Sequence, residues 1–244
     1  MKHLFTFALL LFTTISISQE STLLRLNYAI GDTYLMKMHM TQDMGEAMKM
    51  NMVIDMPMEV IEANDSINST KMSFNRVVMN MDQSGTKISY DSNMKEEEMD
   101  EAGKMMNAQM SPMLETVLAI KSNMYGEVID LSLLEGTGNA SQFADQAQSV
   151  VYPEEPISVG YSWTDEKEKS GMNISSTYTV KSIDETNVNI DVSGGVSGAA
   201  SGTLTGALSI NKNSGVPTLS TINMEFETMG QKVKSDIIIS VEKT

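Results

Sequence analysis

Methionine is the residue whose number and spacing in this chain point most clearly to chemistry. Of the 23 methionines, nine fall between Met36 and Met58, and most of them are two residues apart. Flexible, polarizable thioethers form an adaptable apolar surface, and they also coordinate soft metal ions such as Cu(I). Alternating apolar residues can equally be ordinary core. The window therefore supports three hypotheses: a hydrophobic-ligand wall, a Cu(I) site, or a structural core.

A spacing of two is the period of a β-strand, in which alternate side chains share a face. The methionines with this spacing, which form the candidate ligand-binding wall, are Met36, Met38, Met40, Met48, Met50, Met52, Met56 and Met58. A hairpin turn near Gly45 predicts that Met40 lies opposite Met50 and Met38 opposite Met52. These four sulfurs are the candidate ligands of the alternative Cu(I) site.

Small residues at 193–202 suggest how a cavity could form beside the methionines. This stretch is rich in glycine, alanine and serine, which fill little space opposite a wall of long side chains. We therefore favour an exported, non-enzymatic protein that binds a hydrophobic or lipid-like molecule on a methionine-lined β-face. The alternatives are a periplasmic Cu(I)-binding protein and a purely structural or interaction domain. No cofactor is expected.

Searches for catalytic groups are negative. The chain contains no cysteine, which excludes disulfides, thiol catalysis and thiolate metal sites. His39 alternates out of phase with the methionines, so we expect it on the solvent face. Glu96, Glu97 and Glu98 suit the solvated first turn of a helix better than a calcium site. We expect no enzymatic activity and no catalytic residues.

The charge balance restricts the partners. Seventeen basic residues face 32 acidic ones, for a net charge of −15. Nucleic-acid binding requires a basic footprint, so it is not expected. Docking on anionic lipid headgroups is disfavoured for the same reason. The acidic surface favours solubility.

The N-terminus predicts export. Lys2 is followed by an apolar run over residues 4–12 and then by small residues near Ser18, which is the layout of a secretory signal peptide. We expect residues 1–18 to be removed, leaving a single β-rich domain, 19–244. No segment of that mature chain has the roughly 20 apolar residues of a membrane-spanning helix. The expected location is periplasmic or extracellular.

Alternation and turn residues predict a mainly β fold, an antiparallel incomplete barrel or curved sheet covered by two short helices. The helices are expected at about 93–113, capped by Asn93, and at about 139–151, capped by Asn139. Strands are expected over 33–41, 48–58, 67–81, 86–90, 117–121, 127–133, 162–169, 173–183, 187–192, 203–211, 218–227 and 232–242.

The two halves of the chain resemble each other. Residues 30–34 and 159–163 both place an apolar residue and a glycine before an aromatic that opens a strand, and residues 60–65 resemble 180–185. This pattern suggests a duplicated β-unit with half-repeats at about 24–135 and 155–244. The first copy would then contain a helical insertion near 93–113.

These features together resemble a known class of proteins. The sequence runs from a signal peptide through Gly31-Asp32-Thr33-Tyr34 and methionine-alternating hairpins to a helix. It then has the segment 152–160, Tyr-Pro-Glu-Glu-Pro-Ile-Ser-Val-Gly, with Trp163 after it. This order resembles uncharacterised exported proteins of Gram-negative envelopes, classed as domains of unknown function. The resemblance implies a fold similar to the lipoprotein carriers, an incomplete barrel with helices over its open side. Tyr161 stands where that pattern commonly has an acidic residue.

Overall fold

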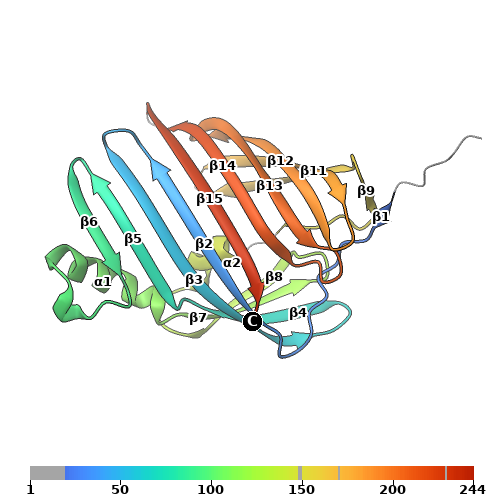
Figure 1. Ribbon diagram of the computed structural model, residues 1–244, viewed down its shortest axis with the longest axis horizontal. Helices are drawn as coiled ribbons and strands as arrows, with labels where there is room; N and C mark the ends of the chain where they lie inside the picture. Colours follow the sequence, from blue (N-terminus) through green and yellow to red (C-terminus); the bar gives the residue numbers. More distant parts are fainter. Residues whose placement is uncertain (1–19, 148–149, 170, 229) are drawn as a thin grey trace, which may run out of the picture.

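The computed structural model describes residues 20–147, 150–169, 171–228 and 230–244, and it consists mainly of one long antiparallel sheet (Figure 1). The strands of this sheet are β2 (Thr33–Asp43), β3 (Met48–Ala63), β4 (Ile67–Ser73), β5 (Arg76–Gln83), β6 (Thr86–Asp91), β7 (Val117–Asn123), β8 (Val128–Glu135), β10 (Ser162–Lys169), β11 (Met172–Ile183), β12 (Asn187–Gly198), β13 (Ser201–Asn211), β14 (Pro217–Thr228) and β15 (Gln231–Lys243). A separate two-stranded ribbon joins β1 (Ser21–Thr22) to β9 (Ile157–Ser158).

The sheet is curved and does not close. Its strand order is β10-β11-β12-β13-β14-β15-β2-β3-β4-β7-β8. The C-terminal strand β15 therefore pairs with β2 and joins the two halves of the chain. Figure 1 shows β4, β7 and β8 at a steep angle to the broad face formed by β5, β3, β2, β15 and β14. The predicted fold class, a mainly β antiparallel curved sheet, is confirmed.

The sheet forks along β3. Met48 to Asp55 pair with β5, whereas Met58 to Ala63 pair with β4. Between the two ladders lies Pro57, at a position where neither β4 nor β5 is opposite β3. Because proline has no amide hydrogen to donate to a ladder, this position suits it. The fork sends β5 and β6 along one branch and β4, β7 and β8 along the other.

The first helix begins later than predicted. The helix α1 is Glu101–Leu114, and Glu96–Glu98 form a separate 3₁₀ turn, η1. Asp100 caps α1, since its Oδ1 accepts a hydrogen bond from the amide of Gly103 at 2.7 Å. Met99, just before it, has an extended backbone and a buried side chain. The chain must therefore leave helical geometry to place Met99 in the core, and the predicted Asn93 cap is wrong.

The second helical segment is shorter than predicted. It consists of a 3₁₀ turn, η2 (Ala140–Phe143), and one turn of helix, α2 (Ala144–Ala147). The predicted cap is present, because Asn139 Oδ1 accepts a hydrogen bond from the amide of Ser141 at 3.0 Å. Residues 148–149 lie outside the described residues. Residues 150–151 are not helical, and the Tyr152 amide after them bonds to the carbonyl of Tyr125 at 2.8 Å.

The local geometry of the two halves matches where their sequences do. The amide of Gly31 bonds to the carbonyl of Val60 at 2.9 Å, and the amide of Gly160 bonds to that of Val180 at 2.8 Å. Both glycines have a φ of +86°. Directly after each valine the strand register shifts by one residue, in β3 and in β11. This recurrence supports the hypothesis of a duplicated β-unit, in which α1 interrupts the first copy between β6 and β7.

Candidate binding face

The predicted methionines lie on one face of the sheet, but their cross-strand partners differ from the prediction. Met40 is opposite Met52 and Met36 is opposite Met56, whereas Met38 faces Ile54. The predicted pairs Met40–Met50 and Met38–Met52 are therefore wrong by two residues. An even shift keeps every side chain on its predicted face.

The turn explains this shift in register. The loop between β2 and β3 contains four residues, 44–47, and Asp43 pairs with Lys49. Asp43 Oδ1 accepts a hydrogen bond from the amide of Gly45 at 2.7 Å, and the amide of Met44 bonds to the carbonyl of Met48 at 2.8 Å. These bonds fix a longer turn than one centred tightly on Gly45.

The methionine face continues across ten strands. The row that contains Met40 reads, from β10 to β6, Trp163, Tyr178, Val192, Gly206, Ile222, Ile237, Met40, Met52, Met79 and Tyr90. We call this side of the sheet the inner face. The helix α1 packs on it through Met106, which lies in one hydrophobic cluster with Met79 and Tyr90.

The opposite, outer face is polar. Its cross-strand neighbours form exposed ion pairs and polar contacts, such as Lys234 with Glu225 at 2.7 Å and Asn223 with Asp236 at 2.6 Å. His39 lies there as predicted, with its Nε2 at 3.1 Å from Asn51 Oδ1. The two faces therefore differ sharply in polarity, and the inner face is the one suited to an apolar ligand.

The core on the inner face is divided. One cluster lies under α1 and α2 and includes Met56 and Met79, and a second lies under β10 to β13 and includes Tyr178 and Val192. A small third cluster surrounds Tyr34. Several partly buried apolar residues of the inner face, among them Met48 and Phe226, belong to none of these clusters. Three of them are neighbours on β2 and β15. These residues, which we call the central strip, are Met40, Ile237 and Ile239.

The methionines divide between core and accessible surface. Met56 is only 1% exposed and fills the core. The other predicted ligand-wall residues are partly buried, and Met38, Met50 and Met52 pack against the first cluster at its margin. The central strip therefore lies next to methionines that retain some exposure.

The small residues at 193–202 alternate between the two faces of the sheet. Only some of them, such as Gly194 and Gly202, face inward. A Cβ on Gly194 would lie 1.9 Å from the carbonyl oxygen of Ser175, and one on Gly202 would lie 2.2 Å from that of Glu225. These glycines allow close approach of neighbouring strands, which is how sheets bend. The role of this stretch as a space-leaving wall stays a prediction.

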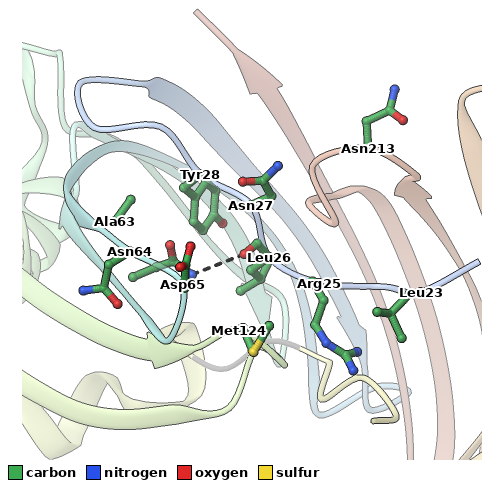
Figure 2. Close-up of a pocket in the computed structure, with 11 residues that line it drawn as sticks. Leu23, Arg25, Leu26, Asn27, Tyr28, Ala63, Asn64, Asp65, Met124 and Asn213 are labelled. Atoms are coloured by element: carbon green, nitrogen blue, oxygen red, sulfur yellow. Dashed lines mark hydrogen bonds between the residues drawn. The ribbon is translucent and has the colours of Figure 1, made fainter. Parts of the chain in front are cut away.

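A cleft of about 510 Å³ lies at the end of the sheet where residues 23–28, the N-terminal strap, cross the strand turns (Figure 2). The strap bonds to both halves: the Leu26 amide donates to the carbonyl of Met124 and the Asn27 amide to that of Ser214, each at 2.8 Å. The side-chain amide of Asn68 donates a hydrogen bond to the Leu26 carbonyl at 3.4 Å. None of the methionines predicted as site residues lines this cleft.

Sequence reasoning missed the strap. Leu24 is 1% exposed and is part of the second cluster. The guanidinium of Arg25 donates to the carbonyl of Pro153 at 2.8 Å and lies 4.3 Å from the ring centroid of Tyr125. The signal available in the sequence was the alternation of Leu24, Arg25 and Leu26, which is too short to identify an element alone.

Asp32, which follows the strap, is linked to Lys243 of the C-terminal strand. Asp32 accepts hydrogen bonds from Lys243 Nζ at 2.7 Å and from the Tyr34 hydroxyl at 3.3 Å. The hydrogen bond from Lys243 lowers the pKa of Asp32. Burial raises the pKa of Tyr34 to about 12. Burial also raises the pKa of Tyr28, whose ring meets that of Tyr34 edge-on at 5.6 Å. These tyrosines are therefore protonated at neutral pH and serve as packing groups.

Two further properties of the described residues concern metal ligands and membrane-spanning helices. In the described parts of the chain, no group of three or more His, Cys, Asp or Glu residues is placed to hold a metal ion. The methionines of the alternative Cu(I) site are paired in a different register from the predicted one, because Met52 lies between Met40 and Met79. Among the same described residues, no helix has the length and apolar character needed to span a bilayer.

Part of the chain matches a family of unknown function, and the fold is similar to that of a solved structure. The model of a family of unknown function, DUF6263, matches residues 131–217. No curated protein matches the chain. A chain solved in a study of lipid–protein interactions in lipovitellin is similar in structure, with a TM-score of 0.57, 9% identity, and coverage of 88% of this chain and 25% of that one. The protein therefore spans about a quarter of that solved chain, and the likeness is one of fold.

Proposed function

We propose that the protein is an exported, non-enzymatic binding protein that holds a hydrophobic or lipid-like molecule against the inner face of its sheet. The observation that carries this proposal is the division of the core. The row of the inner face that contains Met40 has no polar or charged residue type other than the aromatic ones from β10 to β6. Yet Met40, Ile237 and Ile239 lie between the clusters and remain partly exposed. A long apolar molecule over these residues would make the hydrophobic layer continuous.

The energetics favour an extended ligand. Covering roughly 200 Å² of apolar surface contributes about 5 kcal/mol at ~25 cal/mol per Å². Association itself costs about 4–15 kcal/mol in lost freedom. A small apolar molecule on this face would therefore bind weakly. A long chain that also contacts the flanking methionines has enough area to bind, and flexible methionines can adapt to its shape.

The fold likeness supports the same proposal. The lipovitellin chain comes from a study of lipid–protein interactions, and a quarter of it is similar in structure to 88% of this protein. A curved sheet with one apolar face offers a lipid an extended surface without requiring a closed cavity. The support is by analogy of architecture.

A matched pair of adjacent residues tests the proposal. Ile237 lies on the inner face, whereas Ile238 lies on the outer face and is 44% exposed. Ile237→Glu should reduce binding of a long-chain fluorescent lipid probe at least about tenfold, because a buried charge has no partner there. Ile238→Glu should leave binding unchanged, and circular dichroism checks the fold of both. Equal binding by Ile237→Glu and the parent would refute the proposed site.

A Cu(I) site is the second candidate, and the in-register row Met40–Met52–Met79 is the observation that favours it. Replacing Met38, Met40, Met50 and Met52 by leucine conserves volume and apolar character but removes two of the three sulfurs of this row, those of Met40 and Met52. Apolar-ligand binding should survive this change. One-to-one Cu(I) binding by the parent that disappears in the variant would favour the copper function instead.

Export is part of the proposal and has its own test. Residues 1–18, on which it rests, lie outside the described residues. N-terminal sequencing of the protein from its native cells should find a start near Gln19, in the periplasm or the medium. A chain that retains Met1 in the cytoplasm would contradict export. The envelope origin follows only from the resemblance in sequence order.

A further inference from the structure

We propose that the bound molecule carries an uncharged polar group, such as the hydroxyl of a long-chain alcohol or a glyceride, and that Ser235 and Gln42 hold this group. The inference rests on the proposed function, since it specifies the ligand of the same inner face. It also excludes a class of ligand, the anionic lipids, that the apolar surface alone would admit.

Ser235 and Gln42 form a polar pair within the apolar face. They are direct cross-strand partners on β15 and β2. Met224 lies on the far side of Ser235 and Met50 on the far side of Gln42. Ser235 is 6% exposed and Gln42 is partly buried. Two adjacent polar side chains in an otherwise apolar region are costly unless they form hydrogen bonds.

The hydrogen bonds of the neighbouring side chains do not involve these two side chains. The hydrogen bonds made by neighbouring side chains are on the outer face, from Lys234 to Glu225, from Asn223 to Asp236 and from Thr41 to Asp236. None of these bonds uses Ser235 or Gln42. A carboxamide offers two donors and a carbonyl acceptor, and a hydroxyl offers one donor and an acceptor. Together they can satisfy a ligand hydroxyl or ester without any charge.

The pair lies in line with the central strip. Moving along β15 and β2 from Ser235 and Gln42, the next inner positions are Ile237 and Met40, followed by Ile239 and Met38. From Ser235 to Val241 the strand extends about 20 Å at ~3.3 Å per residue. A ligand whose polar end sits at the pair can therefore place a long hydrocarbon chain over the central strip.

The charges around the face disfavour an anionic headgroup. In the described strands from β12 to β5, the only charged residue at an inner position is Lys243. Lys243 is about 26 Å along β15 from Ser235 at ~3.3 Å per residue, and it is already paired with Asp32. On the edge strand β10, Asp165 and Lys167 pair with each other at 3.4 Å.

A carboxylate or phosphate at Ser235 would thus be desolvated without a cation beside it, which is strongly unfavourable. The net charge of −15 would add long-range repulsion. An uncharged hydroxyl pays neither penalty.

Two ligands that have the same hydrocarbon chain but differ in headgroup charge test whether the face prefers an uncharged polar group. Palmityl alcohol and palmitate, delivered from cyclodextrin at pH 8, would each be titrated against the full mature protein by displacement of a fluorescent apolar probe. The alcohol should bind at least about tenfold more tightly than palmitate. Tighter or equal binding of palmitate would overturn this inference while leaving the proposed function intact. Binding of neither ligand would overturn both.

Variants of Ser235 and Gln42 test whether these two residues hold the polar group of the ligand. The double change Ser235→Ala and Gln42→Leu should weaken alcohol binding about fivefold, the loss expected for one or two neutral hydrogen bonds, and should narrow the preference over palmitate. Gln42→Lys should shift the preference toward palmitate by supplying a cation. Thr41→Val, one residue away on the outer face, is the control and should change neither affinity. An unchanged preference in both Gln42 variants would remove these residues from the site.

Discussion

The side chains of β2 and β3 show which properties of a residue follow from spacing alone. The period of two placed Met40 and Met52 on one face, because alternation is a local property of a strand. Their pairing as direct partners depended on the turn, where Asp43 bonds to Gly45 and lengthens the loop. The burial of Met56 depended on packing from distant elements. Face, register and burial thus become progressively less predictable from sequence.

The polar pair at Ser235 and Gln42 illustrates the same limit. Each residue by itself is an ordinary polar residue in an alternating strand. Their proximity arises only because β15, the C-terminal strand, pairs with β2. No periodicity in the chain indicates which distant strands become neighbours.

At the residue scale, Asp32 should make stability depend on pH. Its lowered pKa means that the charged form is favoured by folding, chiefly through Lys243. The stabilisation is present above the unfolded pKa of about 3.9 and is lost as pH falls through the lower folded pKa. Asp32→Asn should therefore reduce the urea midpoint at pH 7, with a difference from the parent that shrinks below about pH 4.

Glu242→Gln is the control for this comparison. Glu242 is exposed and adjacent to Lys243 in sequence, so it changes the net charge equally without removing the pair. A destabilisation by Asp32→Asn that is the same at pH 3 and pH 7 would show that the contribution of Asp32 is not its charge.

At the scale of elements, the N-terminal strap should contribute to stability through its buried side chains. Leu24 is 1% exposed, whereas Leu23 beside it is 47% exposed. Leu24→Ala should lower the free energy of unfolding by about 2–5 kcal/mol through lost burial and a cavity. Leu23→Ala should change it by less than about 0.5 kcal/mol. Urea denaturation followed by fluorescence measures both, and equal effects would mean that the strap is not docked in solution.

The bend of the sheet at β12 should depend on Gly194. A Cβ there would lie 1.9 Å from the carbonyl oxygen of Ser175, while a Cβ on Gly195 would lie 3.3 Å from the nearest atom, the carbonyl oxygen of Gly202. Gly194→Ala should destabilise by about 1–3 kcal/mol or more, since strands must move apart. Gly195→Ala requires only a small adjustment. The melting temperatures of the two variants give the comparison, and a smaller effect at Gly194 would contradict it.

Elements differed in how well the sequence predicted them. The strands β10, β11, β14 and β15 match their predicted ranges within one residue because alternation and turn residues agree there. The strand β12 instead continues to Gly198, beyond its predicted end at 192. The start of α1 was wrong because two acceptable caps, Asn93 and Asp100, compete, and the packing of Met99 selects the second. The strap is too short for a periodic signal.

At the scale of the whole molecule, the protein is one curved sheet whose two halves meet through β15 and β2. The apolar inner face belongs to both halves. The first cluster comes mainly from the first half, and the second comes mainly from the second half together with Leu24 and Leu26 of the strap. The seam between them is where the central strip lies. The proposed binding region would lie at this junction, and neither half would form it alone.

The proposed binding on the inner face is tested most sharply by the position at which a long-chain alcohol contacts the protein. A long-chain alcohol with a photoactivatable group at the end of its chain would be irradiated in complex with the mature protein, and the labelled residues identified by mass spectrometry. We expect labels on the inner face, at Met38, Met40, Ile237 or Ile239, and none on outer-face neighbours such as Ile238. Labels confined to the outer face, or to the cleft beside the N-terminal strap, would contradict it.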